Sequence, residues 1–237
     1  FFLSLSLYRF RGAAHENCNL QYRILPKQWK LPVVFPNLKG YDSHLIIKSL
    51  KREHGKVRAI PTNLQRFLTF SVGQLRFIDS YQFMSESISE LANNLATSEL
   101  HHTRAGFPDD RQFALVQQKG VYPYNYIDDH VKFRETQLPP KESFYNTLYD
   151  EPISDDDYQH AREVWDVFNC IDLEAYHDIY LKTDILLLAD IFEKFRKMCE
   201  QNYGLDPAHY VGSPGLSWDA MLKRTGVELE LFTDQNM

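Results

Sequence analysis

The sequence has few cysteines and no long apolar segment. Its three cysteines, Cys18, Cys170 and Cys199, are odd in number and include no Cys-x-x-Cys pair. This usage argues against a disulfide framework and for an intracellular protein, nuclear or cytoplasmic. No run of about 18 apolar residues is present, so we expect no membrane-spanning helix. The 237 residues are 43% hydrophobic and 24% charged, which excludes disordered, collagen-like and fibrous chains.

Acidic residues are scarce at the start of the chain, and basic residues are scarce toward its end. Residues 1–60 carry 11 Lys and Arg against 3 Asp and Glu, whereas residues 137–237 carry 8 against 20. The basic part could attract phosphate, but the acidic remainder argues against nucleic-acid binding by bulk charge. Two solvated faces of opposite sign explain the pattern equally well. Any nucleic-acid binding therefore needs a local site.

Strand patterns come first in the chain, and helix patterns follow. Four strands are predicted, over residues 31–35, 56–60, 67–72 and 74–78, with a hairpin turn at Gly73. Helices are predicted over residues 41–53 and 85–95. Residues 97–150 give only short, mixed signals, and no element is assigned there.

Two stronger helix patterns follow. Ser154 precedes three aspartates, a typical helix start, and that helix runs to about Phe168. Asp172 caps a longer helix that ends near Gly204. Strands followed by helices predict an α/β domain around a mixed sheet.

Tyr180 and Asp184 lie one turn apart on the same face of the longer helix. The buried stripe of this helix is supplied by Ile179, Leu186, Leu187, Ile191, Phe192 and Phe195. A carboxylate near such a stripe is costly unless it is paired or holds a metal. The alternative is an aspartate at the rim of the core that meets Lys182 or solvent.

A second polar group flanks the joint between the first strand and the first helix. Asn37, Tyr41 and Asp42 lie around a glycine-containing turn. Asp42 could equally be a helix N-cap, which is a purely structural role. Tyr41 and Tyr180 could likewise be core aromatic residues with hydrated hydroxyls.

These two groups together resemble known motifs. Asn37-x3-Tyr41-Asp42 and Tyr180-x3-Asp184 resemble the second and third exonuclease motifs of family-B DNA polymerases, in the protein-primed branch of Maverick/Polinton-type transposons and related viral or plasmid elements. The resemblance covers nearly the whole chain, since similar stretches occur at residues 35–46, 75–80, 119–124 and 213–219. It implies a ribonuclease-H-like 3′–5′ exonuclease core, a mixed sheet flanked by helices, within a DNA-directed DNA polymerase.

The resemblance also implies roles for the catalytic residues. Asp42 and Asp184 are matched to metal-site carboxylates, and Tyr180 to the residue that orients the attacking water. Lys119 is matched to a lysine that steadies the scissile phosphate. The implied metal is Mg²⁺ or Mn²⁺, because hard cations take oxygen ligands and substrate phosphates.

The remaining matched residues are implied to bind DNA. Asn37 and Tyr41 hold the single-stranded 3′ end, and Ser80 contacts the same strand. Tyr122 and Tyr124, followed by Tyr126, offer rings for base stacking. A packed tyrosine cluster is an equally good explanation for these three. The implied partners are single-stranded and primer-template DNA, deoxynucleotides in the complete enzyme, and a terminal protein; a membrane partner is not expected.

Two parts of the family pattern are missing from the sequence. The Asp-x-Glu of the first exonuclease motif should precede residue 37, and the palm carboxylates should follow residue 237. We therefore expect a piece truncated at both ends and inactive by itself, because each carboxylate lost weakens a hard-cation site. The alternative is a transposon-derived relic that at most binds single-stranded DNA.

The first residues carry one more motif. Residues 11–19 resemble the distal half of an endonuclease-VII-like His-Asn-His module, and a stand-alone nuclease that uses His15 is the weakest hypothesis. His15 and Cys18 supply two of the roughly four ligands that zinc needs, so a metal-free loop is favoured. The expected organisation is a remnant insertion at residues 1–30, an exonuclease domain at 31–204 and a junction toward the palm at 205–237.

Overall fold

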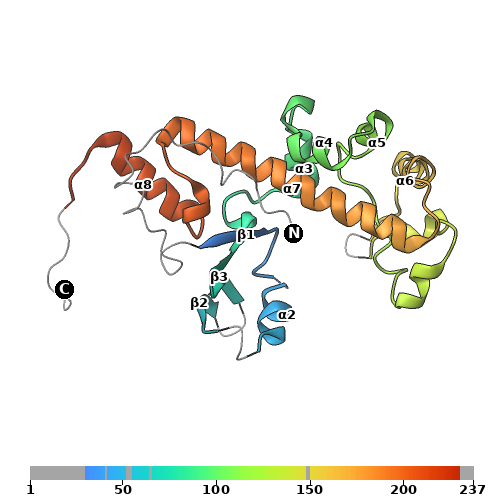
Figure 1. Cartoon of the computed structure of the whole chain (residues 1–237), viewed down its shortest axis with the longest axis horizontal. Helices are drawn as coiled ribbons and strands as arrows, with labels where there is room; N and C mark the ends of the chain where they lie inside the picture. Colours follow the sequence, from blue (N-terminus) through green and yellow to red (C-terminus); the bar gives the residue numbers. More distant parts are fainter. Residues whose placement is uncertain (1–29, 41, 52–54, 64–65, 148–149, 230–237) are drawn as a thin grey trace, which may run out of the picture.

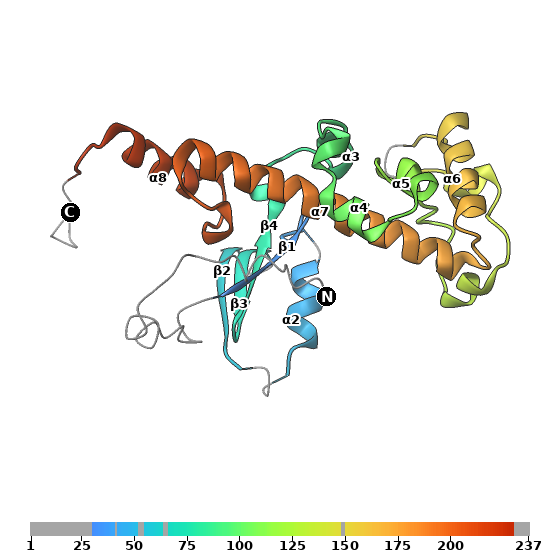
Figure 2. The same cartoon turned by 45° about the horizontal axis from the view of Figure 1, so that its top comes forward.

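The computed structural model describes residues 30–40, 42–51, 55–63, 66–147 and 150–229. Its longest element is helix α7 (Leu173–Tyr203), and the other elements are arranged along this helix (Figure 1). The sheet and helix α2 (Asp42–Ser49) lie on one side of α7, and the shorter helices between residues 88 and 167 pack along it (Figure 2). The predicted α/β architecture, a mixed sheet flanked by helices, is confirmed.

The sheet has the strand order β1-β4-β3-β2. Its strands are β1 (Leu31–Phe35), β2 (Val57–Asn63), β3 (Arg66–Val72) and β4 (Leu75–Asp79). Strand β1 runs parallel to β4, and the other neighbours are antiparallel. All four predicted strands are present. Strands β3 and β4 form the predicted hairpin at Gly73, whose φ of 57° suits glycine.

Helix α2 covers one face of the sheet. Ile46 and Ile47 pack with Leu38 against Phe70 and Phe77, whose rings stack 4.4 Å apart. Replacing a buried phenylalanine such as Phe70 by alanine should cost about 3–5 kcal/mol. The helix predicted over residues 41–53 ends earlier, at Ser49, and Leu50 beyond its end still packs against this cluster.

Three short helices lie between residues 88 and 115, where periodicity predicted only one helix. Helix α3 (Ile88–Asn93) is the centre of the helix predicted over residues 85–95, and Ser87 and Glu90 form a capping box at its start. Helices α4 (His101–Gly106) and α5 (Asp110–Leu115) were not predicted. Each has six residues, fewer than two turns, so neither displays an amphipathic period.

Helices α6 (Asp155–Val167) and α7 begin where their caps predicted. The Ser154 hydroxyl accepts from the Asp157 N–H at 3.0 Å, and the Asp172 carboxylate accepts from the Ala175 N–H at 2.9 Å. Helix α7 ends at Tyr203, and Gly204, with a φ of 61°, is the expected left-handed C-cap. Both predicted helices are confirmed.

Helix α8 (Ser213–Thr225) was not predicted, although the sequence carries its signals. Pro214 lies in its first turn, and Gly226 follows its last residue with a φ of 65°. The Ser213 hydroxyl donates to the Phe83 carbonyl at 3.1 Å, which ties the start of α8 to the chain that leaves the sheet.

Two buried clusters join the helices to α7. In the first, Leu187 and Ile191 pack with Phe107 and Val116; in the second, Tyr176 is among the buried members. Of the predicted stripe, the buried residues are Leu186, Leu187, Ile191 and Phe192, which confirms that this face points into the core. No helix in the described part of the chain is both long and apolar enough to cross a bilayer.

Candidate nucleic-acid and metal site

The loop that follows α5 packs along the amino-terminal half of α7. The Tyr176 hydroxyl donates to the Val121 carbonyl at 2.8 Å and anchors the loop one turn before Tyr180. The Tyr126 N–H donates to the Pro123 carbonyl at 3.1 Å and closes a turn. The loop and the helix together place five predicted site residues in one group, called here the Lys119–Asp184 cluster: Lys119, Tyr122, Tyr124, Tyr180 and Asp184.

Asp184 is paired with Lys119 across this group. The ammonium of Lys119 lies 3.3 Å from one carboxylate oxygen of Asp184, whose side chain is 18% exposed. The alternative partner was Lys182, but that ammonium donates to the Gly106 carbonyl at 2.7 Å and lies over the Phe107 ring. The alternative named Lys182 or solvent as the partner of Asp184; in the structure Lys182 is bonded elsewhere, and Asp184 meets Lys119 with its side chain still 18% exposed.

The second oxygen of Asp184 has no hydrogen-bond partner in the described part of the chain. Its Oδ1 atom is buried and accepts no hydrogen bond from the described residues. Burial raises the pKa of Asp184 above its ordinary value, and this outweighs the lowering by Lys119 and by the Tyr180 hydroxyl. A buried acceptor without a donor is costly, and a bound cation would remove that cost. The oxygen therefore fits a metal ligand.

Tyr180 is enclosed by the loop. Its hydroxyl lies 2.6 Å from that of Tyr124, and its ring stacks on Tyr122 with centroids 4.8 Å apart. A Cβ added at Gly120 would lie 3.4 Å from the Tyr180 ring, so the small residue lets the loop approach closely. Burial, followed by the negative charge of Asp184, raises the pKa of the Tyr180 hydroxyl, which therefore stays protonated and can donate.

The three loop tyrosines have different surroundings. Tyr122 packs between Tyr180 and His177, and burial raises its pKa to about 12. Tyr126 donates its hydroxyl to the Glu135 carboxylate at 2.7 Å, and the Lys132 ammonium lies 3.8 Å from the centre of its ring. A packed tyrosine cluster describes both of these residues. Tyr124 is 65% exposed, so its ring is the one available for a base.

His177 belongs to the same face of α7 and was not singled out from the sequence. Its Nδ1 lies 2.7 Å from the Tyr122 hydroxyl, and its ring also contacts Phe133. Its spacing of three residues from Tyr180, which places both side chains on one face of the helix, was the sequence signal that could have identified His177. His177 therefore supports the ring on which Tyr180 stacks.

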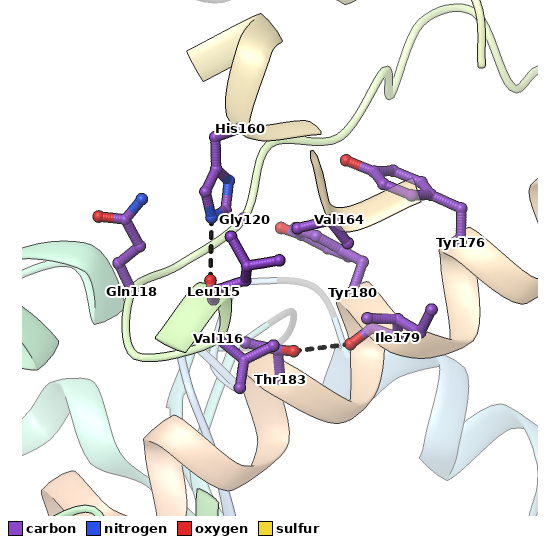
Figure 3. A pocket seen from close by; sticks show the side chains of 10 residues that line it. All are labelled: Leu115, Val116, Gln118, Gly120, His160, Val164, Tyr176, Ile179, Tyr180 and Thr183. Atoms are coloured by element: carbon purple, nitrogen blue, oxygen red, sulfur yellow. Dashed lines mark hydrogen bonds between the residues drawn. The ribbon is translucent and has the colours of Figure 1, made fainter. Parts of the chain in front are cut away.

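A small pocket lies beside the cluster. It has a volume of about 20 Å³, room for one water molecule, and is lined by α5, α6, α7 and the loop (Figure 3). Tyr180 and Thr183 line it, and the His160 Nε2 lies 2.9 Å from the Leu115 carbonyl. Neither Lys119 nor Asp184 lines this pocket, so it is not the place where a phosphate would meet them.

The turn before α2 holds the second predicted group. Asn37 is exposed with a φ of 54°, in the left-handed region that asparagine tolerates. Asp42 is the first residue of α2, so it lies inside the helix and not at the N-cap position of the structural alternative; the helix dipole still favours its negative charge there. Tyr41 lies outside the described residues, as do His15 and Cys18.

A buried carboxylate holds this turn against the sheet. Asp79, at the end of β4, is fully buried and accepts from the Lys39 N–H at 3.1 Å and the Tyr81 N–H at 3.0 Å. The neighbouring Ser80 is 6% exposed and donates to the Phe35 carbonyl at 3.2 Å. Ser80 therefore joins the ends of β1 and β4, with its hydroxyl turned away from solvent.

A second buried carboxylate was also missed from the sequence. Asp190 of α7 is 2% exposed and accepts from the N–H groups of His102 and Thr103 at 2.7 and 2.9 Å, and from the Thr103 hydroxyl at 2.8 Å. It caps α4 from a neighbouring helix. Every bond is to α4, so Asp190 has a structural role.

The two predicted metal carboxylates are not joined by contacts. Within the described part of the chain, no hydrogen bond or ion pair links Asp42 to the Lys119–Asp184 cluster. No group of three His, Cys, Asp or Glu side chains in that part could hold a metal ion. Among the described residues, the candidate metal ligands are therefore the unpaired oxygen of Asp184 and the carboxylate of Asp42 at the start of α2.

The chain is thus a mixed α/β protein that carries the Lys119–Asp184 cluster. A lysine ammonium can bind phosphate, and an exposed tyrosine ring can stack on the bases of a single strand. The family model of DNA polymerase type B, organellar and viral, matches residues 26–227. The chain therefore belongs to the organellar and viral type B DNA polymerases. No curated protein and no solved structure gives a significant match.

Proposed function

We propose that the chain is the 3′–5′ exonuclease region of a family-B DNA polymerase, with a ribonuclease-H-like core. Residues 31–204 form this region, and residues 205–237 lead toward the palm. The observation that carries the proposal is the ion pair of Lys119 with Asp184, in which the Lys119 ammonium also lies 5.9 Å from the centre of the Tyr180 ring. These residues come from a loop and a helix that are far apart in sequence, which favours a built site.

The proposed reaction is hydrolysis of the last phosphodiester bond of a single strand. Water attacks phosphorus, the bond to the 3′ oxygen of the preceding nucleotide breaks, and a nucleoside 5′-monophosphate leaves. A bound Mg²⁺ or Mn²⁺ supplies activation of the water and stabilisation of the leaving oxygen. Asp184 Oδ1 and Asp42 would hold the metal, since one is an unpaired buried oxygen and the other opens a helix at the sheet edge.

Tyr180 and Lys119 then position the reacting groups. The Tyr180 hydroxyl keeps its proton because its pKa is raised, so it can orient a water or a phosphate oxygen by donating. The Lys119 side chain is 30% exposed, so its ammonium can turn from Asp184 to an incoming phosphate. Release of Asp184 from Lys119 would leave both its oxygens for the metal.

The DNA strand would lie over the exposed side of the cluster. Tyr124 stacks on the terminal base, and Asn37 and Tyr41 hold the backbone near the start of α2. Ser80 would not touch the strand itself, because its hydroxyl is bonded to the Phe35 carbonyl; it would hold the ends of β1 and β4 together beside the DNA. The Maverick/Polinton-type branch, terminal-protein priming and use of deoxynucleotides are part of the same proposal and are supported by the sequence resemblance.

The complete polypeptide in which the chain occurs provides the test. With a 5′-labelled single strand and Mg²⁺, it should shorten the strand from the 3′ end. Asp184→Asn should slow this by more than about 100-fold, the upper range for loss of an outer-shell metal partner. Asp178→Asn, an exposed aspartate of the same helix, is the matched control and should keep the rate. Equal rates in the two variants would refute the assignment.

A non-catalytic chain that binds single-stranded DNA is the second candidate. It is favoured by the absence of a three-carboxylate group among the described residues. Binding that falls steeply with salt and is unchanged in Asp184→Ala, together with no 3′ shortening by the complete polypeptide, would support it.

A further inference from the structure

The proton of the Tyr180 hydroxyl can point in more than one direction. The ring itself is held, since it stacks on Tyr122 at an angle of 27° and a Cβ at Gly120 would lie 3.4 Å from it. A phenol hydroxyl carries one proton and can also accept a hydrogen bond, so it can turn that proton toward either of two neighbours. The direction of the proton therefore depends on the groups that surround the hydroxyl.

Two polar groups lie beside this hydroxyl. The Tyr124 hydroxyl lies 2.6 Å from it, and Asp184 follows one helical turn further along α7. Burial raises the pKa of Tyr180 most, and the negative charge of Asp184 comes next, so the hydroxyl keeps its proton next to a carboxylate. A hydrogen bond to an ionised acceptor is stronger than one to a neutral hydroxyl. The Tyr180 proton therefore turns toward Asp184, and the Tyr180 oxygen is left to accept.

Tyr124 is placed to supply the proton for that oxygen. At 2.6 Å one of the two hydroxyls must donate to the other, and the preference of Tyr180 for Asp184 leaves Tyr124 as the donor. The rings of Tyr124 and Tyr180 meet at 87° with their centroids 6.2 Å apart, so Tyr124 reaches Tyr180 with its hydroxyl end. Tyr124 nevertheless remains 65% exposed. Donation to Tyr180 and stacking on a base therefore use different parts of Tyr124.

We propose that Tyr124 is a positioning residue of the exonuclease site, whose hydroxyl donates to Tyr180 and thereby holds the Tyr180 proton toward Asp184. A water or phosphate oxygen bound beside Asp184 would then meet a hydroxyl that already points at it. Hydrogen bonds in such a chain strengthen one another, and no proton moves from one oxygen to another. This inference deepens the proposed function and rests on it, because the direction of this proton affects the rate only if Tyr180 meets the reacting groups.

Steady-state hydrolysis of a 5′-labelled single strand by the complete polypeptide, with Mg²⁺, tests the inference. Tyr124→Phe keeps the ring and loses the hydroxyl, so kcat should fall by about 2- to 10-fold, the range for one neutral hydrogen bond, while KM stays the same. Tyr124→Leu also removes the ring, so KM should rise as well. Tyr210→Phe is the matched control, because its hydroxyl donates to Asp219 at 2.9 Å outside the cluster, and it should change neither constant.

A double variant tests whether Tyr124 acts through Tyr180. If the Tyr124 hydroxyl works only by orienting that of Tyr180, Tyr124→Phe should have no further effect on the residual kcat of Tyr180→Phe. A purely structural loss at Tyr124 would lower kcat by the same factor in both backgrounds. That result would contradict the positioning role.

Other results would also overturn the inference. With an active wild type, an unchanged kcat in Tyr124→Phe would refute the positioning role and leave the proposed function standing. A higher kcat in Tyr124→Phe would mean that Tyr180 donates to Tyr124, which would then withhold the proton. A higher KM at unchanged kcat would assign the Tyr124 hydroxyl to strand binding. A wild type that does not shorten the strand would refute the proposed function, and the inference with it.

Discussion

The ammonium of Lys119 lies 3.3 Å from one carboxylate oxygen of Asp184, while the other oxygen is buried and has no hydrogen-bond partner among the described residues. The pair is thus half satisfied. One lysine from a loop keeps a carboxylate on a helix close to a core, where burial alone would disfavour its charge. Such an arrangement costs stability and is suited to accepting a cation.

Asp184→Asn should stabilise the fold at neutral pH by about 0.5–2 kcal/mol, because it removes a buried charge. The sign follows from the raised pKa of Asp184. Protonated Asp184 favours the folded state, so its stabilising contribution is complete below the ordinary aspartate pKa and is lost as pH rises through the folded pKa. Urea unfolding at several pH values measures the difference, which should shrink on acidification. A difference independent of pH would contradict this explanation.

Lys119→Gln should raise the pKa of Asp184 further, because the ammonium is the main group that lowers it. The carboxyl ¹³C shift of Asp184, followed by NMR as a function of pH, reports the change directly. Lys197→Gln, at an exposed position farther along α7, is the control and should leave the titration in place. An unchanged midpoint in Lys119→Gln would show that the ion pair does not form in solution.

The hydroxyl contact between Tyr124 and Tyr180 should contribute about 0.5–1.5 kcal/mol to stability. A double-mutant cycle with Tyr124→Phe and Tyr180→Phe isolates it, since each substitution removes one hydroxyl and keeps the ring. Pairing Tyr126→Phe with Tyr180→Phe gives the matched cycle, because Tyr126 bonds to Glu135 instead. That second coupling energy should be near zero; equal values for the two cycles would contradict the observed contact.

Asp190→Ala should destabilise the protein by about 2–4 kcal/mol. The substitution leaves two N–H groups at the start of α4 and the buried Thr103 hydroxyl without their acceptor. Asp178→Ala, an exposed aspartate of α7, should change stability by less than about 0.5 kcal/mol. Urea unfolding of both variants is the measurement, and similar losses in the two would show that Asp190 does not cap α4.

Local sequence signals were sufficient to predict the strands and the long helices. The apolar run Leu31–Phe35 marks a strand, and the caps Ser154 and Asp172 mark the starts of two helices. The same is true of the shared face of Tyr180 and Asp184. The loop that packs on this face was not predictable from periodicity, since no local pattern specifies which segment meets a helix. Lys119 was singled out only through the family resemblance, and its contact with Asp184 was not predicted but came from the structure.

Buried polar groups were the least predictable part. Asp79 and Asp190 look like ordinary surface aspartates in the sequence, yet each is buried because a distant backbone segment supplies its donors. His177 was missed for a similar reason, since its partner Tyr122 lies on the loop. Such roles depend on tertiary contacts.

Binding of Mn²⁺ by this chain, followed as loss of the free-ion electron paramagnetic resonance signal, tests most directly whether Asp42 and Asp184 form one metal site. The account predicts weak binding by the wild type that is lost in both Asp42→Asn and Asp184→Asn and kept in Asp178→Asn. Because the metal would bridge α2 and α7, each carboxylate should be required. Binding that survives Asp42→Asn unchanged, or that is absent from the wild type, would contradict the proposed metal site.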